Sequence, residues 1–115
     1  MADDSQLLIP PSFVALFVAP GRVKPSASRD AIFERYEFCE DLSVVLVEQA
    51  GNVRHELGIA EEDVLERVHR GLVEPTAPVT EAEAGWVVGR LAEHLGWQQA
   101  LASLAIVAPP DTGRR

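Results

Sequence analysis

The chain has 115 residues, of which 47% are hydrophobic, and this length and composition predict a single globular domain. Its formal net charge of −8 argues against nucleic acid and anionic membranes as partners, because both attract basic surfaces. The chain has one cysteine, Cys39, which excludes an internal disulfide and favours a reducing compartment.

The N-terminal region contains an apolar run, Phe13–Ala19, that fits neither a signal peptide nor a membrane span. Asp3 and Asp4 precede it where a signal peptide needs basic residues, and it is shorter than the roughly 20 residues that cross a bilayer. We therefore expect a cytoplasmic protein without a targeting segment. We expect Phe13–Val18 to form a short helix capped by Ser12, because a strand would lack a partner strand; an extended segment is the alternative.

Residues 28–57 predict one long amphipathic helix, around which the rest of the chain is organised. Ser28 is a suitable N-cap, and Gly58 fits the left-handed residue that closes a helix. A bend or break is open at Gly51-Asn52. At 1.5 Å per residue this helix would span roughly 40 Å, so shorter helices must pack along it. Its expected buried face recurs at spacings of three and four: Ile32, Tyr36, Cys39, Leu42, Leu46, Ala50, Val53 and Leu57.

Two further helices are predicted after the long one. The first starts at Glu61, with three carboxylates in its first turn, where the helix dipole favours negative charge. The second starts with a capping box, Thr80 and Glu83, of which we expect Glu83 to be the more exposed and less stabilising half. Gly96 breaks or bends this second helix, and helical composition continues from Trp97 to Val107. The expected buried faces are Val64, Leu65, Val68 and Leu72, then Val87, Val88, Leu91, Ala92 and Leu95.

These elements predict an all-α fold. We expect a single domain over residues 1–115: a small helical bundle built on one long central helix (about residues 28–57) with three to five shorter helices. The ends, at about residues 1–8 and 108–115, are expected to be flexible.

Four residues were considered as metal ligands. Glu66 and His69 have an E-x-x-H spacing, and Glu37 and Asp41 lie one turn apart on the long helix. A single E-x-x-H pair lacks the ligand count of a metal site, and such residues more often form a solvated face. We therefore expect no metal and no cofactor.

Aromatic and acidic residues are mixed between Tyr36 and Asp41, a pattern that allows an exposed aromatic ring beside carboxylates and suits a protein-binding patch. A core role is the stronger reading for Tyr36 and Cys39, and the acidic residues also have arginines with which to pair. Trp86 and Trp97 would lie near one helical face if the helix ran through Gly96, and either could anchor a partner, although we expect at least one of them to pack in the core. The candidates for protein interaction are Tyr36, Glu37, Glu40, Asp41, Trp86 and Trp97.

No catalytic pattern was found. The phosphate-binding motif G-x-x-x-x-G-K-[ST] is missing, and the only lysine is Lys24, so ATP hydrolysis by this chain is not expected. Cys39 as a nucleophile would need His55, His69 or His94 as its base, and a buried thiol that fills the core is the better interpretation. We expect that the chain is not an enzyme.

Five motifs support a family resemblance: IPPSFVALF, APGR, RYEFCEDL, ELGIAEEDVLERVHRGL and EAGWVVGRLAEHLGW. Between Ile9 and Trp97 the chain resembles a family of short, acidic, uncharacterised β-proteobacterial proteins, some labelled automatically "ATPase with chaperone activity". The resemblance implies a cytoplasmic bacterial protein with a tie to protein quality control, and it transfers no catalytic residue. We expect a non-enzymatic protein-interaction or adaptor domain, monomeric or homodimeric, with a protein partner. The alternative is a small metal- or ligand-binding helical domain.

Overall fold

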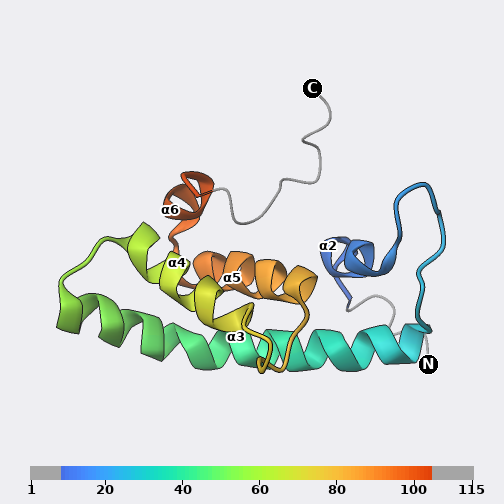
Figure 1. Cartoon of the computed structure of the whole chain (residues 1–115), viewed down its shortest axis with the longest axis horizontal. Helices are drawn as coiled ribbons and strands as arrows, with labels where there is room; N and C mark the ends of the chain where they lie inside the picture. Colours follow the sequence, from blue (N-terminus) through green and yellow to red (C-terminus); the bar gives the residue numbers. More distant parts are fainter. Residues whose placement is uncertain (1–8, 105–115) are drawn as a thin grey trace.

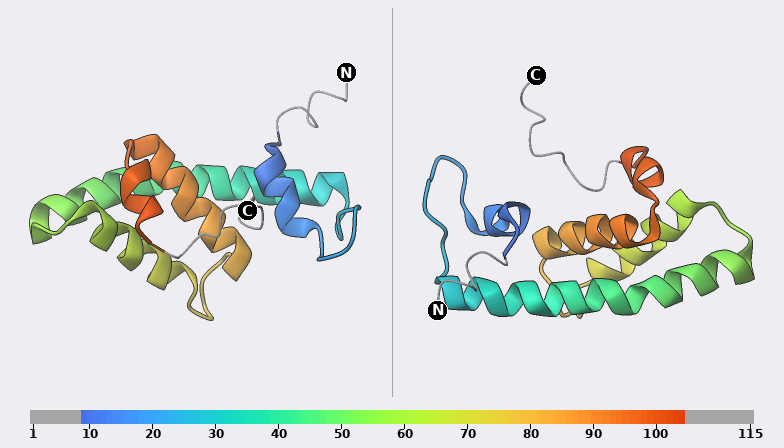
Figure 2. Two further views of the ribbon diagram at one scale, coloured as in Figure 1. Left: turned by 90° about the horizontal axis from the view of Figure 1, so that it is seen from above. Right: turned by 180° about the vertical axis from the view of Figure 1, so that it is seen from behind.

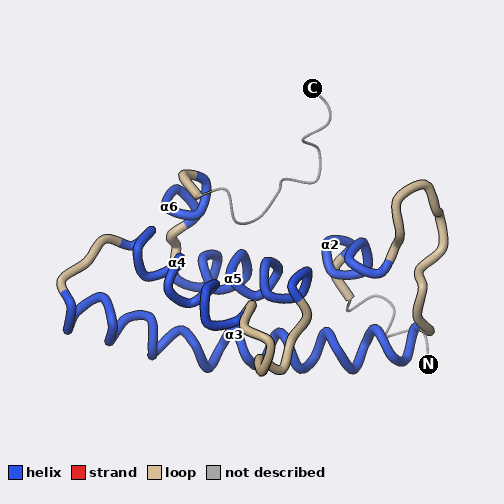
Figure 3. The backbone as a smooth tube through the Cα atoms, in the orientation of Figure 1, coloured by secondary structure: helices blue, strands red, loops and turns tan. Residues whose placement is uncertain are grey.

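The longest element of the computed structural model, which describes residues 9–104, is the central helix α3, Arg29–Leu57. Five elements accompany it: α2 (Pro11–Val14), the 3-10 helix η1 (Ala15–Phe17), α4 (Glu61–Leu72), α5 (Glu81–Leu95) and α6 (Gln98–Ala102). Residues 9–104 contain no strand (Figure 3). The all-α prediction and the long central helix are confirmed. The predicted flexible ends, residues 1–8 and 108–115, lie outside the described residues.

Local side-chain chemistry explains both ends of α3. The Ser28 hydroxyl accepts a hydrogen bond from the Ala31 amide at 3.1 Å, and Gly58 adopts the left-handed conformation (φ 63°) that closes the helix. The break considered at Gly51 does not occur. A glycine costs a helix about 1 kcal/mol, and the neighbouring Ala50 and Val53 both pack into the core.

The shorter helices all lie on one side of α3 (Figures 1 and 2). α4 and α5 run beside its middle and C-terminal half, α2 crosses its N-terminal half, and α6 lies beyond α5, away from α3. Seen from the front and from behind, the opposite side of α3 has no other described helix against it. This side of the central helix therefore meets solvent.

The core consists of two clusters along α3. One joins α3, α4, α5 and α6 around the fully buried Leu65, Val88 and Leu91. The other joins α2, α3 and α5 around Phe13 and Cys39, both also fully buried. α3 holds the two clusters in line because it contributes residues to both.

Two details of the predicted helices are wrong. The first helix starts at Pro11 rather than after Ser12, because a proline fits the first helical position and leaves no amide unpaired. Leu57 was assigned to the buried face but is 53% exposed, because the last turn of α3 lies beyond the packed helices. The buried hydroxyl of Ser43 lies in the interior instead and donates to the Glu40 carbonyl at 2.7 Å.

Gly96 ends α5, because it takes up a left-handed conformation (φ 74°), and a separate short helix follows. The predicted helical stretch from Trp97 is shorter than expected, since α6 ends at Ala102. Residues 105–107 of that stretch lie outside the described residues.

Candidate functional site

The solvent side of α3 carries exposed apolar side chains. Phe38, Val44 and Val45 are 39%, 53% and 57% exposed, although residues of these types are usually buried. They lie opposite the buried residues of α3, such as Cys39 and Ala50. We call the surface that they form with the exposed acidic residues around them the outer face of α3: Glu34, Glu37, Phe38, Asp41, Val44, Val45 and Glu48.

The four carboxylates of the outer face have no ion-pair partner among residues 9–104. Some acidic residues elsewhere do have partners: Glu61 lies 3.7 Å from Arg54, and Glu93 lies 2.8 Å from Arg90. Others, such as Glu62 and Glu74, have none among the residues described. The outer face contains no lysine or arginine. It is therefore a surface on which four carboxylates without an ion-pair partner lie among three exposed apolar side chains.

Arg35 connects the outer face to the interior. Its guanidinium lies 5.0 Å from the centre of the Phe38 ring and donates hydrogen bonds to Glu83, from Nε at 2.9 Å and from Nη2 at 2.7 Å. Nη2 also donates to the Pro78 carbonyl at 3.0 Å. These bonds hold the guanidinium in place, and a cation over an aromatic ring stabilises the position of that ring. The exposed aromatic beside carboxylates that the sequence allowed is thus Phe38.

Glu83 is buried, at 2% exposure, so the prediction that it is the more exposed half of the capping box is wrong. Its carboxylate accepts from the Thr80 amide at 3.0 Å in addition to the Arg35 bonds. Burial alone would raise the pKa of Glu83, but the hydrogen bonds from Arg35 and Thr80 outweigh it and hold the pKa below its usual value. Glu83 is therefore an ionised group of the interior.

Glu40, a predicted interaction residue, points toward α5 and not to the outer face. It accepts hydrogen bonds from Arg90 Nε at 2.8 Å and Nη2 at 3.3 Å, and His94 Nε2 lies 3.3 Å from it. Burial opposes ionisation of Glu40, but the bonds from Arg90 lower its pKa on balance. Arg90 was not identified from the sequence, because its partner lies 50 residues away in the chain.

Tyr36 and Trp86 belong to an aromatic cluster with Phe13. The ring centres lie 5.0 Å apart for Phe13 and Trp86, 5.7 Å for Phe13 and Tyr36, and 5.9 Å for Tyr36 and Trp86, with edge-to-face geometry. Trp86 Nε1 donates to the Ser12 hydroxyl at 3.0 Å. These two predicted interaction residues therefore join α2, α3 and α5.

Trp97 belongs to the other cluster, at the far end of the molecule, with the Arg54 guanidinium 5.8 Å from its ring centre. Because Gly96 ends α5, Trp86 and Trp97 do not share a helical face. The two tryptophans cannot act as one binding surface.

The four candidate metal ligands lie on two different helices. Glu37 and Asp41 are exposed on the outer face of α3, whereas Glu66 and His69 lie on α4, where Glu66 is 3.6 Å from Arg70. Within residues 9–104 no three His, Cys, Asp or Glu side chains gather closely enough to hold a metal ion.

Cys39 is fully buried in the core cluster around Phe13. Burial raises the pKa of its thiol to about 12, with a further contribution from the Glu83 charge and an opposing one from Arg35. The sulfur is therefore protonated at neutral pH, whereas nucleophilic attack requires the thiolate.

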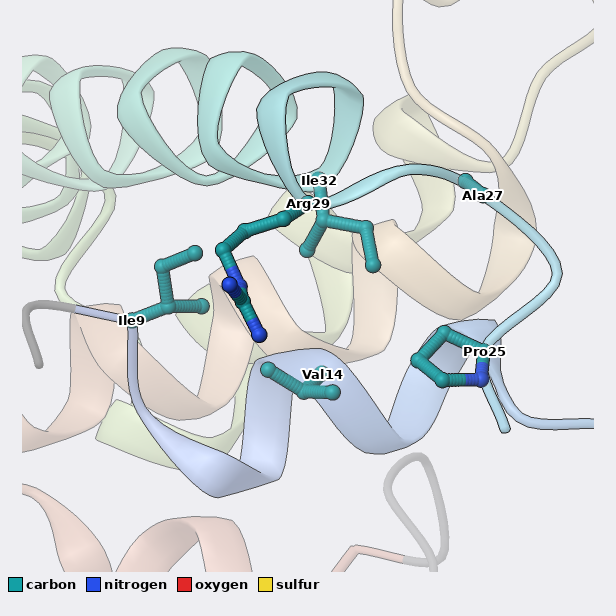
Figure 4. Close-up of a pocket in the computed structure, with 6 residues that line it drawn as sticks. All are labelled: Ile9, Val14, Pro25, Ala27, Arg29 and Ile32. Carbon is teal, nitrogen blue, oxygen red and sulfur yellow. The ribbon is translucent and has the colours of Figure 1, made fainter. Parts of the chain in front are cut away.

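One pocket of about 330 Å³ lies between α2 and the start of α3 (Figure 4). Its walls are mainly apolar, and the side chain of Arg29 extends into it between Ile9 and Val14. Arg29 has no hydrogen-bond or ion-pair partner among the residues described. The lining residues are Ile9, Val14, Pro25, Ala27, Arg29 and Ile32.

Comparisons with models of protein families, with curated proteins and with solved structures found no match to this chain. The resemblance to the β-proteobacterial family therefore stays a prediction. Among the described helices, none has both the length and the hydropathy needed to cross a membrane.

Proposed function

We propose that this chain is a non-enzymatic protein-interaction domain that works in the cytoplasm and binds its partner through the outer face of α3. The observation that carries this proposal is the exposure of Phe38, Val44 and Val45 together on one side of α3, with exposed carboxylates among them. Large apolar side chains that gather exposed on one surface are typical of a protein-binding site.

The outer face suits binding because its helix is already rigid. The two core clusters on the other side of α3 keep this helix folded in the free chain. Binding a partner therefore does not carry the entropy cost of ordering the helix. Val44 and Val45 are branched at Cβ and have few rotamers to lose. Complete burial of a valine or phenylalanine side chain contributes about 1.5–3 kcal/mol, so three partly exposed residues provide useful affinity.

A capture experiment with matched variants tests the proposal. Tagged wild-type chain, Val45→Glu and Val23→Glu are used as baits in lysate of the source organism. Val23 is 91% exposed in the linker before α3, so its substitution makes the same chemical change away from the outer face. We expect a stoichiometric partner with wild type and Val23→Glu that is lost with Val45→Glu. Equal recovery by all three baits, or no stoichiometric protein at all, would contradict the proposal.

The family resemblance supports a narrower version, in which the partner belongs to protein quality control and is itself an ATPase. The chain would then change the ATP turnover of the captured partner without hydrolysing ATP alone. A phosphate-release assay on the chain, the partner and their mixture tests this version. Turnover by the chain alone, or a partner with no role in quality control, would contradict it.

The pocket beside Arg29 favours a second candidate function, the binding of a small ligand. Apolar walls with one guanidinium suit an apolar molecule that ends in a carboxylate. Octanoate should perturb the amide signals of α2 and of the start of α3, and octanol should do so less. Arg29→Gln should abolish the difference between the two probes; equal responses to both in wild type would contradict this candidate.

A further inference from the structure

The spacing of the outer face matches the surface of a packing helix. Phe38 and Val45 are seven residues apart, which places them two turns apart on one stripe, with Asp41 between them. From Glu34 to Glu48 the outer face extends about 21 Å along α3, which is about four turns. An elongated occupant aligned with α3 would cover this whole surface.

The charge of the outer face selects a basic occupant. Its four carboxylates lack partners among residues 9–104, and the nearest arginine, Arg35, is already bonded to Glu83. An apolar segment without charge would remove water from these carboxylates and give nothing in return. Lysine or arginine side chains of the occupant that lie against these carboxylates would compensate the charge and speed association.

The same charge argues against a second copy of the chain as the occupant. In an antiparallel pair of α3 helices centred on Val44 and Val45, Asp41 of one copy would lie opposite Glu48 of the other. Asp41 and Glu48 of each copy would then face carboxylates of the other copy, with no cation on either outer face to separate them. Like charges in contact disfavour a complex, so self-association through this surface is disfavoured.

A helix fits the outer face better than a strand. An extended segment gains its affinity by pairing with the edge of a sheet, and residues 9–104 contain no sheet. The backbone groups of a helix hydrogen-bond to one another, so a helix needs no sheet edge. It packs against another helix through side chains, at an interaxial distance of about 8–10 Å.

We propose that the occupant of the outer face is a basic amphipathic helix of about four turns, supplied by the partner protein. Its apolar side chains cover Phe38, Val44 and Val45, and its lysines and arginines lie against Glu37, Asp41 and the two flanking glutamates. This inference rests on the proposed function, because it specifies the chemistry of the partner at the same surface.

A pair of synthetic peptides provides the first test. The probe is a 16-residue helical peptide with leucines along one stripe and lysines beside it, and its twin has glutamates in place of the lysines. We expect the leucine–lysine peptide to shift the amide signals of α3 at the outer face in the full-length chain, with an affinity that falls as salt is added. The glutamate twin should leave those signals unchanged. Binding of both peptides alike, or of the lysine peptide away from α3, would overturn the inference.

Charge-neutralising variants provide the second test. Glu37→Gln with Asp41→Asn should weaken binding of the leucine–lysine peptide roughly five- to tenfold, on the scale of two exposed charge pairs. The control, Glu62→Gln with Glu74→Gln, removes two exposed charges that lie outside α3 and should change affinity less than twofold. Equal weakening by both double variants would mean that only net charge matters, and it would overturn the inference.

The inference can fail while the proposed function stands. If a native partner is captured in a Val45-dependent manner but Glu37→Gln with Asp41→Asn leaves its affinity unchanged, the outer face binds a partner that is not a basic helix. A dimer of the chain that Val45→Glu disrupts, detected by sedimentation equilibrium, would also overturn the inference.

Discussion

Arg35 on α3 and Glu83 on α5 form a two-bond ion pair, with Nε 2.9 Å and Nη2 2.7 Å from the two carboxylate oxygens. The same carboxylate accepts from the Thr80 amide at 3.0 Å, and the Thr80 hydroxyl accepts from the Glu83 amide at 3.1 Å. The capping box at the start of α5 therefore also attaches α5 to the central helix. The buried Glu83 carboxylate therefore stabilises both the first turn of α5 and the packing of α5 against α3.

Replacing Thr80 with alanine removes only the hydroxyl half of the capping box. We expect the free energy of unfolding to fall by about 1 kcal/mol, the usual cost of losing an N-cap. In a domain of this size the melting midpoint should fall by roughly 3–6 °C, measured by circular dichroism. An unchanged midpoint would mean that the cap does not limit the stability of α5.

Replacing Glu83 with alanine should cost more, about 2–3 kcal/mol. The change removes the other half of the capping box and also leaves the Arg35 guanidinium without its main acceptor. Breaking a fully buried ion pair costs about 3–5 kcal/mol. The Arg35 side chain is 37% exposed, so water can hydrogen-bond its guanidinium after the change, and the expected cost is lower. Urea denaturation of the two single variants compares their losses of unfolding free energy. A smaller loss for Glu83→Ala than for Thr80→Ala would contradict the role of the ion pair.

Acid should destabilise the fold through Glu83 and Glu40. Both carboxyls have a pKa below the ordinary value in the folded chain, so their contribution is present above the unfolded pKa, near 4.5. It is lost as the pH falls through that value toward the lower folded pKa. The free energy of unfolding of Glu83→Gln should therefore depend less on pH between about pH 5 and pH 3 than that of wild type. Parallel curves for the two proteins would contradict this assignment.

Cys39 should react slowly with a thiol probe in the folded chain. Its side chain is fully buried, so the probe cannot reach the sulfur. Its pKa is raised to about 12, so the reactive thiolate is scarcely populated at neutral pH. Denaturant should accelerate labelling to the rate of an ordinary cysteine. Because the folded pKa is the higher one, stability should also fall as the pH rises above about 8.5, and less so in Cys39→Ala. Fast labelling of the native chain would contradict the enclosed position.

The features predicted correctly from the sequence depend on residues close together in the chain. Ser28 caps α3 through an amide three residues away, and Gly58 closes the same helix through its own backbone. Thr80 and Glu83 are likewise three residues apart. Such contacts follow from helix geometry alone, so short patterns are sufficient to predict them.

The features that were missed depend on pairs far apart in the chain. Arg35 and Glu83 are 48 residues apart in the chain, and Arg90 and Glu40 are 50 apart. Hydrophobic periodicity identifies a buried face, but it does not identify which charged residues beside that face form ion pairs. The pattern around Tyr36 allowed an exposed aromatic without saying which ring it is, although a core role was preferred for Tyr36 itself. The cover that α2 provides over this part of α3 leaves Phe38 as the exposed ring instead.

The attachment of α2 to the bundle depends mainly on Phe13. One turn of helix has no stability of its own in water, so α2 keeps its shape only through contacts with α3 and α5. Phe13 is fully buried and its ring lies against Phe17, Tyr36 and Trp86. In Phe13→Ala we expect α2 to detach while α4, α5 and α6 remain folded, because the cluster around Leu91 contains no residue of α2.

Hydrogen exchange separates local detachment from global unfolding. In Phe13→Ala the amides of residues 11–18 should exchange rapidly, those of α4 and α5 should stay protected, and the fluorescence of Trp86 should shift to the red as its ring meets water. Ser12→Ala is the control, since it removes only the 3.0 Å bond from Trp86 and should cost about 1 kcal/mol or less. If Phe13→Ala instead removes protection from α4 and α5 together with α2, the two core clusters unfold as one unit, and the aromatic cluster supports the whole bundle and not α2 alone.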